Sequence, residues 1–341
     1  LFLSAHYGAS KLRWCLDHID KVKQAADDKS LAFGPMASFL LFRLLDEKPM
    51  RVDPANASRT LLWSLKTRSW DDHLLKLFGI PRVALPDCVP TRYDYGHLDF
   101  AGRKLPMTIL NGDQSAALFA YGPLQPESAY INIGTGAFVS RTLGHYPKQN
   151  RRLLTGIVLE EQDNTVYVTE GTVNGAASAL DWAEQALGIE QSINELPDWL
   201  ERSQSPPLFL NGVGGLGSPY WLAHFDSHFV GDASKQEKMV EVIESIVFLL
   251  ESNMQEMLKL ASPPTQIQVS GGLSQLDGLC QRLADISQLP VYRPQEHEAT
   301  ARGTAYLLAG CHSDWPEPGF GQWFKPNPHK RLHQRLSLIH I

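Results

Sequence analysis

The chain has 341 residues, of which 43% are hydrophobic and 20% are charged, and its net charge is -6 at pH 7. These values are typical of a globular protein of up to two domains, and they exclude a disordered or fibrous chain. The basic clusters are short and lack interleaved aromatic residues. We therefore expect a small molecule as partner, and no nucleic acid.

Cysteine spacing and apolar runs bear on the compartment. The four cysteines are far apart and show no spacing typical of a zinc site. Reduced thiols in a cytoplasmic protein are therefore expected rather than a disulfide scaffold. No apolar run approaches the ~20 residues that span a bilayer, and the first residues lack the features of a signal peptide, so we expect no membrane partner.

The first third of the chain is expected to consist mostly of helices and loops. Residues 11–110 include "SKLRWCLDHIDKVKQAA", whose apolar residues have helical spacing, and "MASFLLFRLLDE", which predicts a buried helix. The stretch "VALPDCVPTRYDYGHLD" is marked by Pro and Gly and is expected to be a loop.

From Ala129 onwards the pattern predicts an α/β domain. "AYINIGTGAFVSRTL" predicts a β-hairpin, and "TGIVLE" and "TVYVTEG" predict two further strands. Helices are predicted in "AASALDWAEQALG" and in the long stretch "QEKMVEVIESIVFLLESNMQEMLKLA", on either side of a Gly-rich loop. The last part alternates between strand and helix in "TQIQVSGG", "LDGLCQRLADIS", "PVYRP" and "EATARGTAYLLAG".

Asp113 is the first candidate for chemistry. In "TILNGDQSAALFAYG" it lies between a short apolar run and an Ala-rich helical pattern. Two interpretations follow from these residues alone. Asp113 is either an N-cap that starts a helix, or a carboxylate placed to take a proton from a substrate.

Two glycine turns that follow predicted strands are candidates for phosphate or nucleotide contact. Gly134-Thr135-Gly136 could form a concavity of N–H groups with the Thr135 hydroxyl as a further donor, or a plain hairpin turn that needs positive φ. Gly271-Gly272 ends a strand before a helix, where a ring or phosphate can approach the backbone. Neither a P-loop pattern nor a GxGxxG sequence opening a βαβ unit is present.

The order of these motifs resembles that of the FGGY carbohydrate kinases, and most closely their glycerol kinase members. The resemblance extends to about Phe324 and is carried by "KLRWCLDH", "NASRTLLWSLKTRSWDDHLLKLFGIPRVALPD", "NGDQSAALFAYG", "IGTGAF", "EGTVNGAASALDW", "GGLGSPYW", "VSGGLSQLDGLCQRLADI" and "EATARGTAY". It implies an α/β, actin-like (ribonuclease H-like) fold of two domains with the active site in the cleft between them. It also implies a carbohydrate kinase that uses ATP and Mg²⁺ to phosphorylate a hydroxyl group of a polyol or sugar.

The resemblance also implies roles for individual residues. Asp113 matches the catalytic base, and the substrate-binding positions fall on Gln114, Phe138 and His6. The positions at the ATP phosphates and beside the adenosine fall on Gly134, Thr135, Gly136, Gly271 and Gly272. His6 stands where glycerol kinases have a Tyr that binds a glycerol hydroxyl, which puts glycerol itself in doubt; a surface position near the end of the chain is the alternative interpretation of His6.

We expect three segments: residues 1–120 as the remainder of the N-terminal, substrate-side domain, residues 121–325 as the C-terminal, nucleotide-side domain, and residues 326–341 as a tail whose last six residues are foreign to the natural protein. The family's first phosphate-binding turn and an Arg-Glu pair for the substrate are expected to be missing, so the fragment alone is expected to be inactive. The alternatives are an actin-like ATPase and a catalytically inactive relative that binds nucleotide or sugar. A homo-oligomer is compatible with the resemblance.

Overall fold

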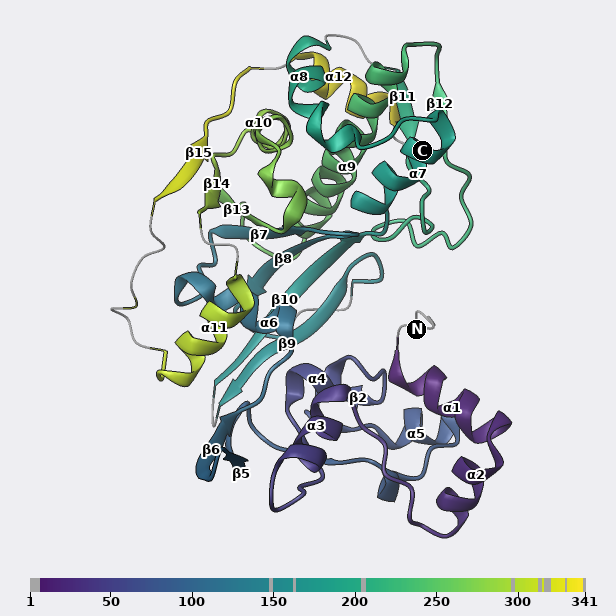
Figure 1. The fold of residues 1–341 in the computed structure, drawn as a ribbon, viewed down its shortest axis with the longest axis vertical. Helices are drawn as coiled ribbons and strands as arrows, with labels where there is room; N and C mark the ends of the chain where they lie inside the picture. Colours follow the sequence, from purple (N-terminus) through teal and green to yellow (C-terminus); the bar gives the residue numbers. More distant parts are fainter. Residues whose placement is uncertain are drawn as a thin grey trace.

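The computed structural model describes residues 7–146, 150–161, 164–203, 207–295, 298–311, 315, 320–328 and 330–339. In Figure 1 the first helices form a separate group below a large sheet, and most later helices lie above that sheet. The described helices include none that is both long and apolar enough to cross a membrane.

The part of the chain before the large sheet combines helices with short strands. Its elements are α1 (Gly8–His18), α2 (Asp20–Asp27), α3 (Met36–Leu44), β1 (Arg51–Val52), α4 (Pro54–Ser58), β2 (Trp63–Ser64), β3 (Ser69–Trp70), α5 (Asp72–Phe78), η1 (Arg82–Ala84), β4 (Asp87–Cys88), β5 (Arg92–Phe100), β6 (Arg103–Ile109), α6 (Asp113–Leu118) and η2 (Phe119–Tyr121).

The remaining part carries the large sheet and its covering helices. Its elements are β7 (Ser128–Ile133), β8 (Ala137–Leu143), β9 (Leu154–Glu161), β10 (Asn164–Val173), α7 (Ala177–Leu187), η3 (Ser192–Asn194), α8 (Leu196–Arg202), β11 (Leu208–Leu210), β12 (His228–Val230), α9 (Lys235–Met257), β13 (Gln266–Ser270), η4 (Gly272–Gln275), α10 (Asp277–Ser287), β14 (Val291–Pro294), α11 (Ala299–Leu308), β15 (Gly321–Phe324) and α12 (Lys330–Ile339).

The large sheet has seven strands in the order β15-β14-β13-β7-β8-β10-β9. β13 runs parallel to β7 and to β14, whereas the β7–β8, β8–β10 and β10–β9 pairs are antiparallel. The hairpin and the two strands predicted after it are therefore confirmed. The sheet brings the ends of β7 and β13, which are far apart in the sequence, next to each other.

The two faces of this sheet differ because successive side chains of a strand point to opposite faces. Ile131, Val139 and Val269 lie on the face covered by α9 and α10 and are fully or almost fully buried. On the other face, Asn132 is opposite Phe138 and Ser140 is opposite Glu170. This second face faces α6 and α11, so the polar positions of the strands line the space below the sheet.

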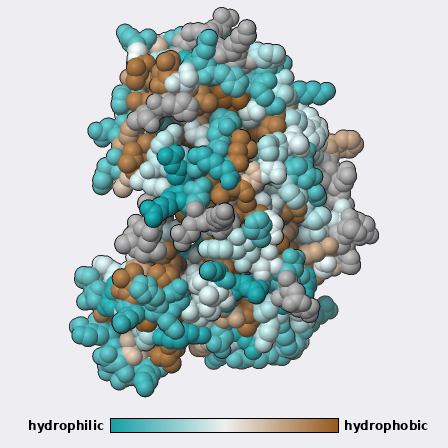
Figure 2. Space-filling view, turned by 180° about the vertical axis from the view of Figure 1, so that it is seen from behind, coloured by the Kyte–Doolittle hydropathy of each residue, from teal (hydrophilic) through white to brown (hydrophobic). Residues whose placement is uncertain are grey.

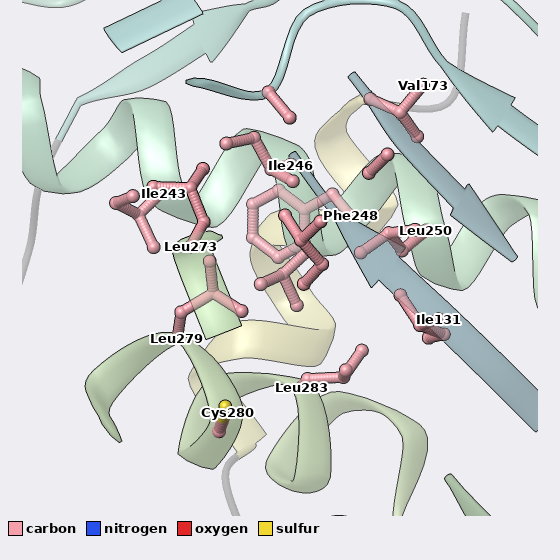
Figure 3. Packing of buried hydrophobic residues seen from close by; sticks show 14 of the residues in the cluster. Ile131, Val173, Ile243, Ile246, Phe248, Leu250, Leu273, Leu279, Cys280 and Leu283 are labelled. Atoms are coloured by element: carbon pink, nitrogen blue, oxygen red, sulfur yellow. The ribbon is translucent and has the colours of Figure 1, made fainter. Parts of the chain in front are cut away.

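The main core lies between the apolar face of the sheet and α9. α9 starts with a capping box, in which Ser234 and Glu237 bond each other's backbone N–H groups. Its apolar residues then face the sheet and α10; Figure 3 shows Phe248 and Ile246 of α9 among Ile131 and Leu283. This packing fixes the sheet from above and leaves its polar face for other contacts.

The first helices have a core of their own. The rings of Trp63 and Trp70 meet edge to face, with centroids 5.2 Å apart. Asp53, which is fully buried, caps α4 by accepting hydrogen bonds from the N–H groups of Ala55 and Asn56. Figure 2 shows the face opposite to that of Figure 1, on which hydrophilic residues predominate and hydrophobic residues form scattered patches.

Three predictions for the first third of the chain were wrong. The helix predicted over "SKLRWCLDHIDKVKQAA" is broken into α1 and α2 at Ile19, whose backbone is extended. α3 is not buried, since Met36 and Phe39 expose 71% and 57% of their surface. The predicted loop after residue 90 is strand β5, which pairs with β6. The backbone hydrogen bonds of β5 come from its pairing with β6, which the Pro and Gly residues of this stretch did not indicate.

Candidate functional site

Asp113 is the first residue of α6, directly after the loop that follows β6. The N-cap position belongs to Gly112, and the Asp113 carboxylate accepts a hydrogen bond from the N–H of Gln114 at 2.7 Å. Asn111 holds the preceding turn by accepting a bond from the N–H of Gly112 and donating one to the carbonyl of Val158 in β9. Asp113 and Gln114 are both exposed at the start of the helix.

A cavity of about 280 Å³ lies between the start of α6, the start of α11 and the polar face of the sheet. Its lining residues come from α6 and the turn after it, from β7, β8, β10 and β13, and from α11. They are Asp113, Gln114, Ala117, Leu118, Tyr121, Tyr130, Ile131, Asn132, Phe138, Ser140, Glu170, Ser270, Ala299 and Thr300. The cavity thus brings together three residues assigned from the resemblance, namely Asp113, Gln114 and Phe138.

The Gly134-Thr135-Gly136 turn joins β7 to β8 at one end of the sheet. Neither glycine has positive φ, so the alternative of a hairpin turn that needs positive φ was wrong. Gly136 is required for another reason, because an added Cβ would lie 2.9 Å from the carbonyl oxygen of Val173. The Thr135 carbonyl accepts bonds from the start of α7, while the residue as a whole is exposed.

Gly271 brings the second glycine turn next to the first. It has φ of +89°, and an added Cβ would lie 2.6 Å from the carbonyl oxygen of Ile133, the residue before Gly134. Gly272 has open space around its α-carbon and begins the 3-10 helix η4, so the predicted direct passage from strand to α-helix is interrupted by one short turn. Both glycine turns therefore lie at the same end of neighbouring strands, β7 and β13.

The charges of the cavity are Asp113 and Glu170, and Glu170 is paired with Arg59. Nη2 of Arg59 lies 2.7 Å from Oε1 of Glu170. This neighbouring carboxylate raises the pKa of the Arg59 guanidinium above its ordinary value. The cavity therefore combines one exposed carboxylate with one neutralised ion pair.

Several of these lining residues were missed by the sequence analysis. Asn132 and Ser270 lie in strands, and their signal is a polar residue at every second position among apolar ones. Glu170 lies in β10, where Val166 and Val168 precede it at every second position, so it carries no such signal. Thr300 carries no local signal, since it reaches the cavity only through the packing of α11 on α6. His6 lies outside the described residues.

The described ranges contain no group of three or more His, Cys, Asp or Glu side chains that could hold a metal ion. Mg²⁺ in phosphoryl-transfer sites is bound by one or two carboxylates together with substrate phosphates, so a single carboxylate such as Asp113 is compatible with it.

Comparison with known proteins gives the family. Residues 1–120 match the N-terminal domain of the FGGY family of carbohydrate kinases, and residues 129–310 match its C-terminal domain. The chain belongs to the FGGY family of carbohydrate kinases.

Individual FGGY kinases are similar over nearly all of the chain. A glycerol kinase of Shewanella frigidimarina is 32% identical over 326 residues, which are 92% of this chain and 65% of that protein. A glycerol kinase of Geobacter sp. (strain M21) is 33% identical over 353 residues, covering 98% of this chain and 71% of that protein. The chain thus spans about two thirds of the length of these FGGY kinases.

Solved FGGY kinase structures share the fold. The crystal structure of Plasmodium falciparum glycerol kinase with ADP has a TM-score of 0.84 at 22% identity and covers 96% of this chain and 69% of its own. Gluconate kinase from Lactobacillus acidophilus has a TM-score of 0.78 at 23% identity, with 98% and 70% covered. The two-domain, actin-like α/β fold expected from the resemblance is confirmed. The proposed boundaries at residues 120 and 325 stay a prediction.

Proposed function

We propose that this FGGY protein transfers a phosphoryl group from ATP to a hydroxyl group of a polyol or sugar, with Asp113 as the general base. The observation that supports this most is that Asp113, Gln114 and Phe138 line one cavity. That cavity also includes Asn132, one residue before the end of β7, and Ser270, the last residue of β13, and the two glycine turns follow these strands. Acceptor and nucleotide would thus bind at adjoining places.

The chemistry requires few protein groups. An alcohol is a poor nucleophile, and a carboxylate within hydrogen-bond reach orients it and accepts its proton as the O–P bond forms. In this proposal Asp113 takes that proton, Gln114 binds a neighbouring hydroxyl, and the ring of Phe138 packs on the carbon face of the acceptor. The remaining barrier is lowered by positioning and by neutralising phosphate charge.

The nucleotide is proposed to bind at the two glycine turns. Gly134, Thr135 and Gly136 would contact the phosphates, with the exposed Thr135 hydroxyl as a donor, and Gly271 and Gly272 would allow the adenosine to approach the backbone. Mg²⁺ bound to the ATP would neutralise phosphate charge, and Asp113 is a carboxylate that would be available to it. We further propose that the protein is cytoplasmic and that it forms a homo-oligomer.

Phosphoryl transfer by the full-length protein tests this function. ATP consumption should depend on an acceptor when glycerol, erythritol, xylulose, ribulose and gluconate are offered one at a time. ATP turnover without any acceptor would instead support an actin-like ATPase, and nucleotide binding without transfer would support an inactive relative. The proposal is contradicted if none of the polyols and sugars offered gives a phosphorylated product.

A further inference from the structure

The cavity ends, on the sheet side, in a carboxylate that the proposed reaction does not use. Glu170 lies in β10, directly opposite Ser140 of β8, and it lines the cavity together with Asp113 and Phe138. Only 6% of its surface is exposed. A carboxylate this deeply buried is costly unless it is paired, so its presence at the cavity wall needs a physical reason.

Arg59 supplies the pairing charge from a distant part of the chain. It directly follows α4, and its Nη2 lies 2.6 Å from Oε2 and 2.7 Å from Oε1 of Glu170, 111 residues away. The guanidinium reaches Glu170 across β9 at Gly156, where an added Cβ would lie 3.4 Å from both Nη2 of Arg59 and Oε2 of Glu170. A glycine in β9 therefore leaves room for the ion pair.

The pair leaves Glu170 able to accept a further hydrogen bond. One nitrogen of Arg59 contacts both carboxylate oxygens, whereas a carboxylate offers about four lone-pair sites. Arg59 remains 40% exposed along its side chain. The phenol of Tyr7 lies near both charges, and burial raises its pKa, so it stays neutral beside them. The wall of the cavity thus offers a charged acceptor with spare capacity.

This arrangement favours a particular class of acceptor. A hydroxyl group can donate to an ionised carboxylate, and such charge-assisted bonds are stronger than neutral ones. The carboxylate of a sugar acid has no proton to donate at neutral pH and is repelled by the unpaired carboxylate of Asp113. The cavity therefore suits an uncharged acceptor.

We propose that Glu170 is a specificity-determining residue that accepts a hydrogen bond from a second hydroxyl group of a neutral polyol or sugar, and that Arg59 is the positioning residue that holds its carboxylate. The inference rests on the proposed kinase function and deepens it. It predicts that neutral polyols and sugars are better acceptors than sugar acids.

The test compares Glu170→Gln, Glu170→Asp and Arg59→Lys in the full-length protein with a matched control, Glu161→Gln. Glu161 also forms an ion pair that links β5 to the sheet, with Nε of Arg92 3.1 Å away, but it is not part of the cavity lining. For a neutral acceptor, Glu170→Gln should raise KM by about tenfold or more, because a bond to a charged group is lost. The kcat and the KM for ATP should change little, whereas the melting temperature should fall because Arg59 loses its counter-charge.

Further readouts separate recognition from structure. Glu170→Asp, which keeps the charge but withdraws it by one methylene, should also raise the acceptor KM, and Arg59→Lys should raise it less because an ion pair remains. Glu170→Gln should narrow the difference in kcat/KM between a neutral sugar and a sugar acid. Glu161→Gln should leave all of these values unchanged.

The outcomes distinguish this inference from the proposed function. If the unsubstituted protein phosphorylates no acceptor and binds none in calorimetry, the proposed function fails and the inference fails with it. If the unsubstituted protein is active but Glu170→Gln and Glu170→Asp leave the acceptor KM unchanged, only the inference is overturned. A fall in melting temperature shared equally by Glu170→Gln and Glu161→Gln, without a change in acceptor KM, overturns it too.

Discussion

The α-carbon of Gly303 in α11 lies directly against the carbonyl oxygen of Ala116 in α6, so that an added Cβ would lie 1.8 Å from that oxygen. Two hydrogen bonds flank this contact. The Thr300 hydroxyl donates to the carbonyl of Asp113 at 3.3 Å, and Nε of Arg302 donates to the carbonyl of Ala120 at 2.6 Å. The position of the proposed base therefore depends on a helix 187 residues further along the chain.

Gly303→Ala should displace α6 and lower both stability and activity. Its methyl group has no room beside Ala116, and overpacking of this kind costs about 1–3 kcal/mol. Because α6 carries Asp113, kcat should fall by about tenfold or more while the protein stays folded. Gly144→Ala is the control, since Gly144 is exposed and has open space around its α-carbon. If Gly303→Ala and Gly144→Ala have the same melting temperature and the same kcat, the contact between Gly303 and Ala116 does not position α6.

Asp113→Asn should remove activity without affecting stability. The side chain is exposed, and its loss as a proton acceptor should lower kcat by about 10²- to 10⁴-fold. Asp72 offers a matched control, because it is likewise the exposed first residue of a short helix, α5, but lies outside the cavity lining. Steady-state kinetics and thermal unfolding of both variants provide the measurement. Retention of full kcat by Asp113→Asn would exclude it as the base.

Gly271→Ala should weaken ATP binding and destabilise the protein. Alanine at φ of +89° is strained, and its methyl group would meet the carbonyl of Ile133 at 2.6 Å. Gly102→Ala isolates the backbone cost of about 1 kcal/mol, because Gly102 has φ of +77° but nothing within 4 Å. We expect Gly271→Ala to lose clearly more stability in urea unfolding and to raise the KM for ATP, whereas Gly102→Ala should leave that KM unchanged.

Glu251 should make the protein less stable as pH rises. This carboxyl group of α9 is 4% exposed, and burial raises its pKa to about 7. The folded state therefore binds its proton more tightly than the unfolded state, whose pKa is the ordinary 4.5. The free energy of unfolding should fall as pH rises from about 4.5 to about 7, and should then stay lower.

Glu251→Gln tests this pH dependence, because the amide keeps the shape of the side chain and cannot ionise. At pH 8 it should raise the free energy of unfolding by about 1–3 kcal/mol, and near pH 4.5 it should have little effect. Urea unfolding at the two pH values measures both. Glu201→Gln, at an exposed position in α8, should not change the slope with pH. An equal stability change at both pH values would show that folding does not raise the pKa of Glu251.

Much of the second half of the fold followed from local sequence patterns. Two β-rich runs on either side of a Gly-Thr-Gly turn predicted the β7–β8 hairpin, and two further β-rich runs predicted the strands after it. The long helix α9 follows from its apolar periodicity. In the first third, β5 was missed because the Pro and Gly residues before and within it favoured a loop, although a two-residue turn, Ala101-Gly102, joins β5 to β6.

The sequence by itself determined the family, the order of the strands and helices around the cavity, and Asp113 as the candidate base, because these depend on short motifs and periodicities. Only the tertiary structure decided that Arg59 pairs with Glu170, that Gly303 supports the helix of Asp113, and that two glycine turns share one end of the sheet. The physical reason is that each of these relationships is a contact between segments more than 100 residues apart, whose strength depends on the close approach that the folded backbone allows.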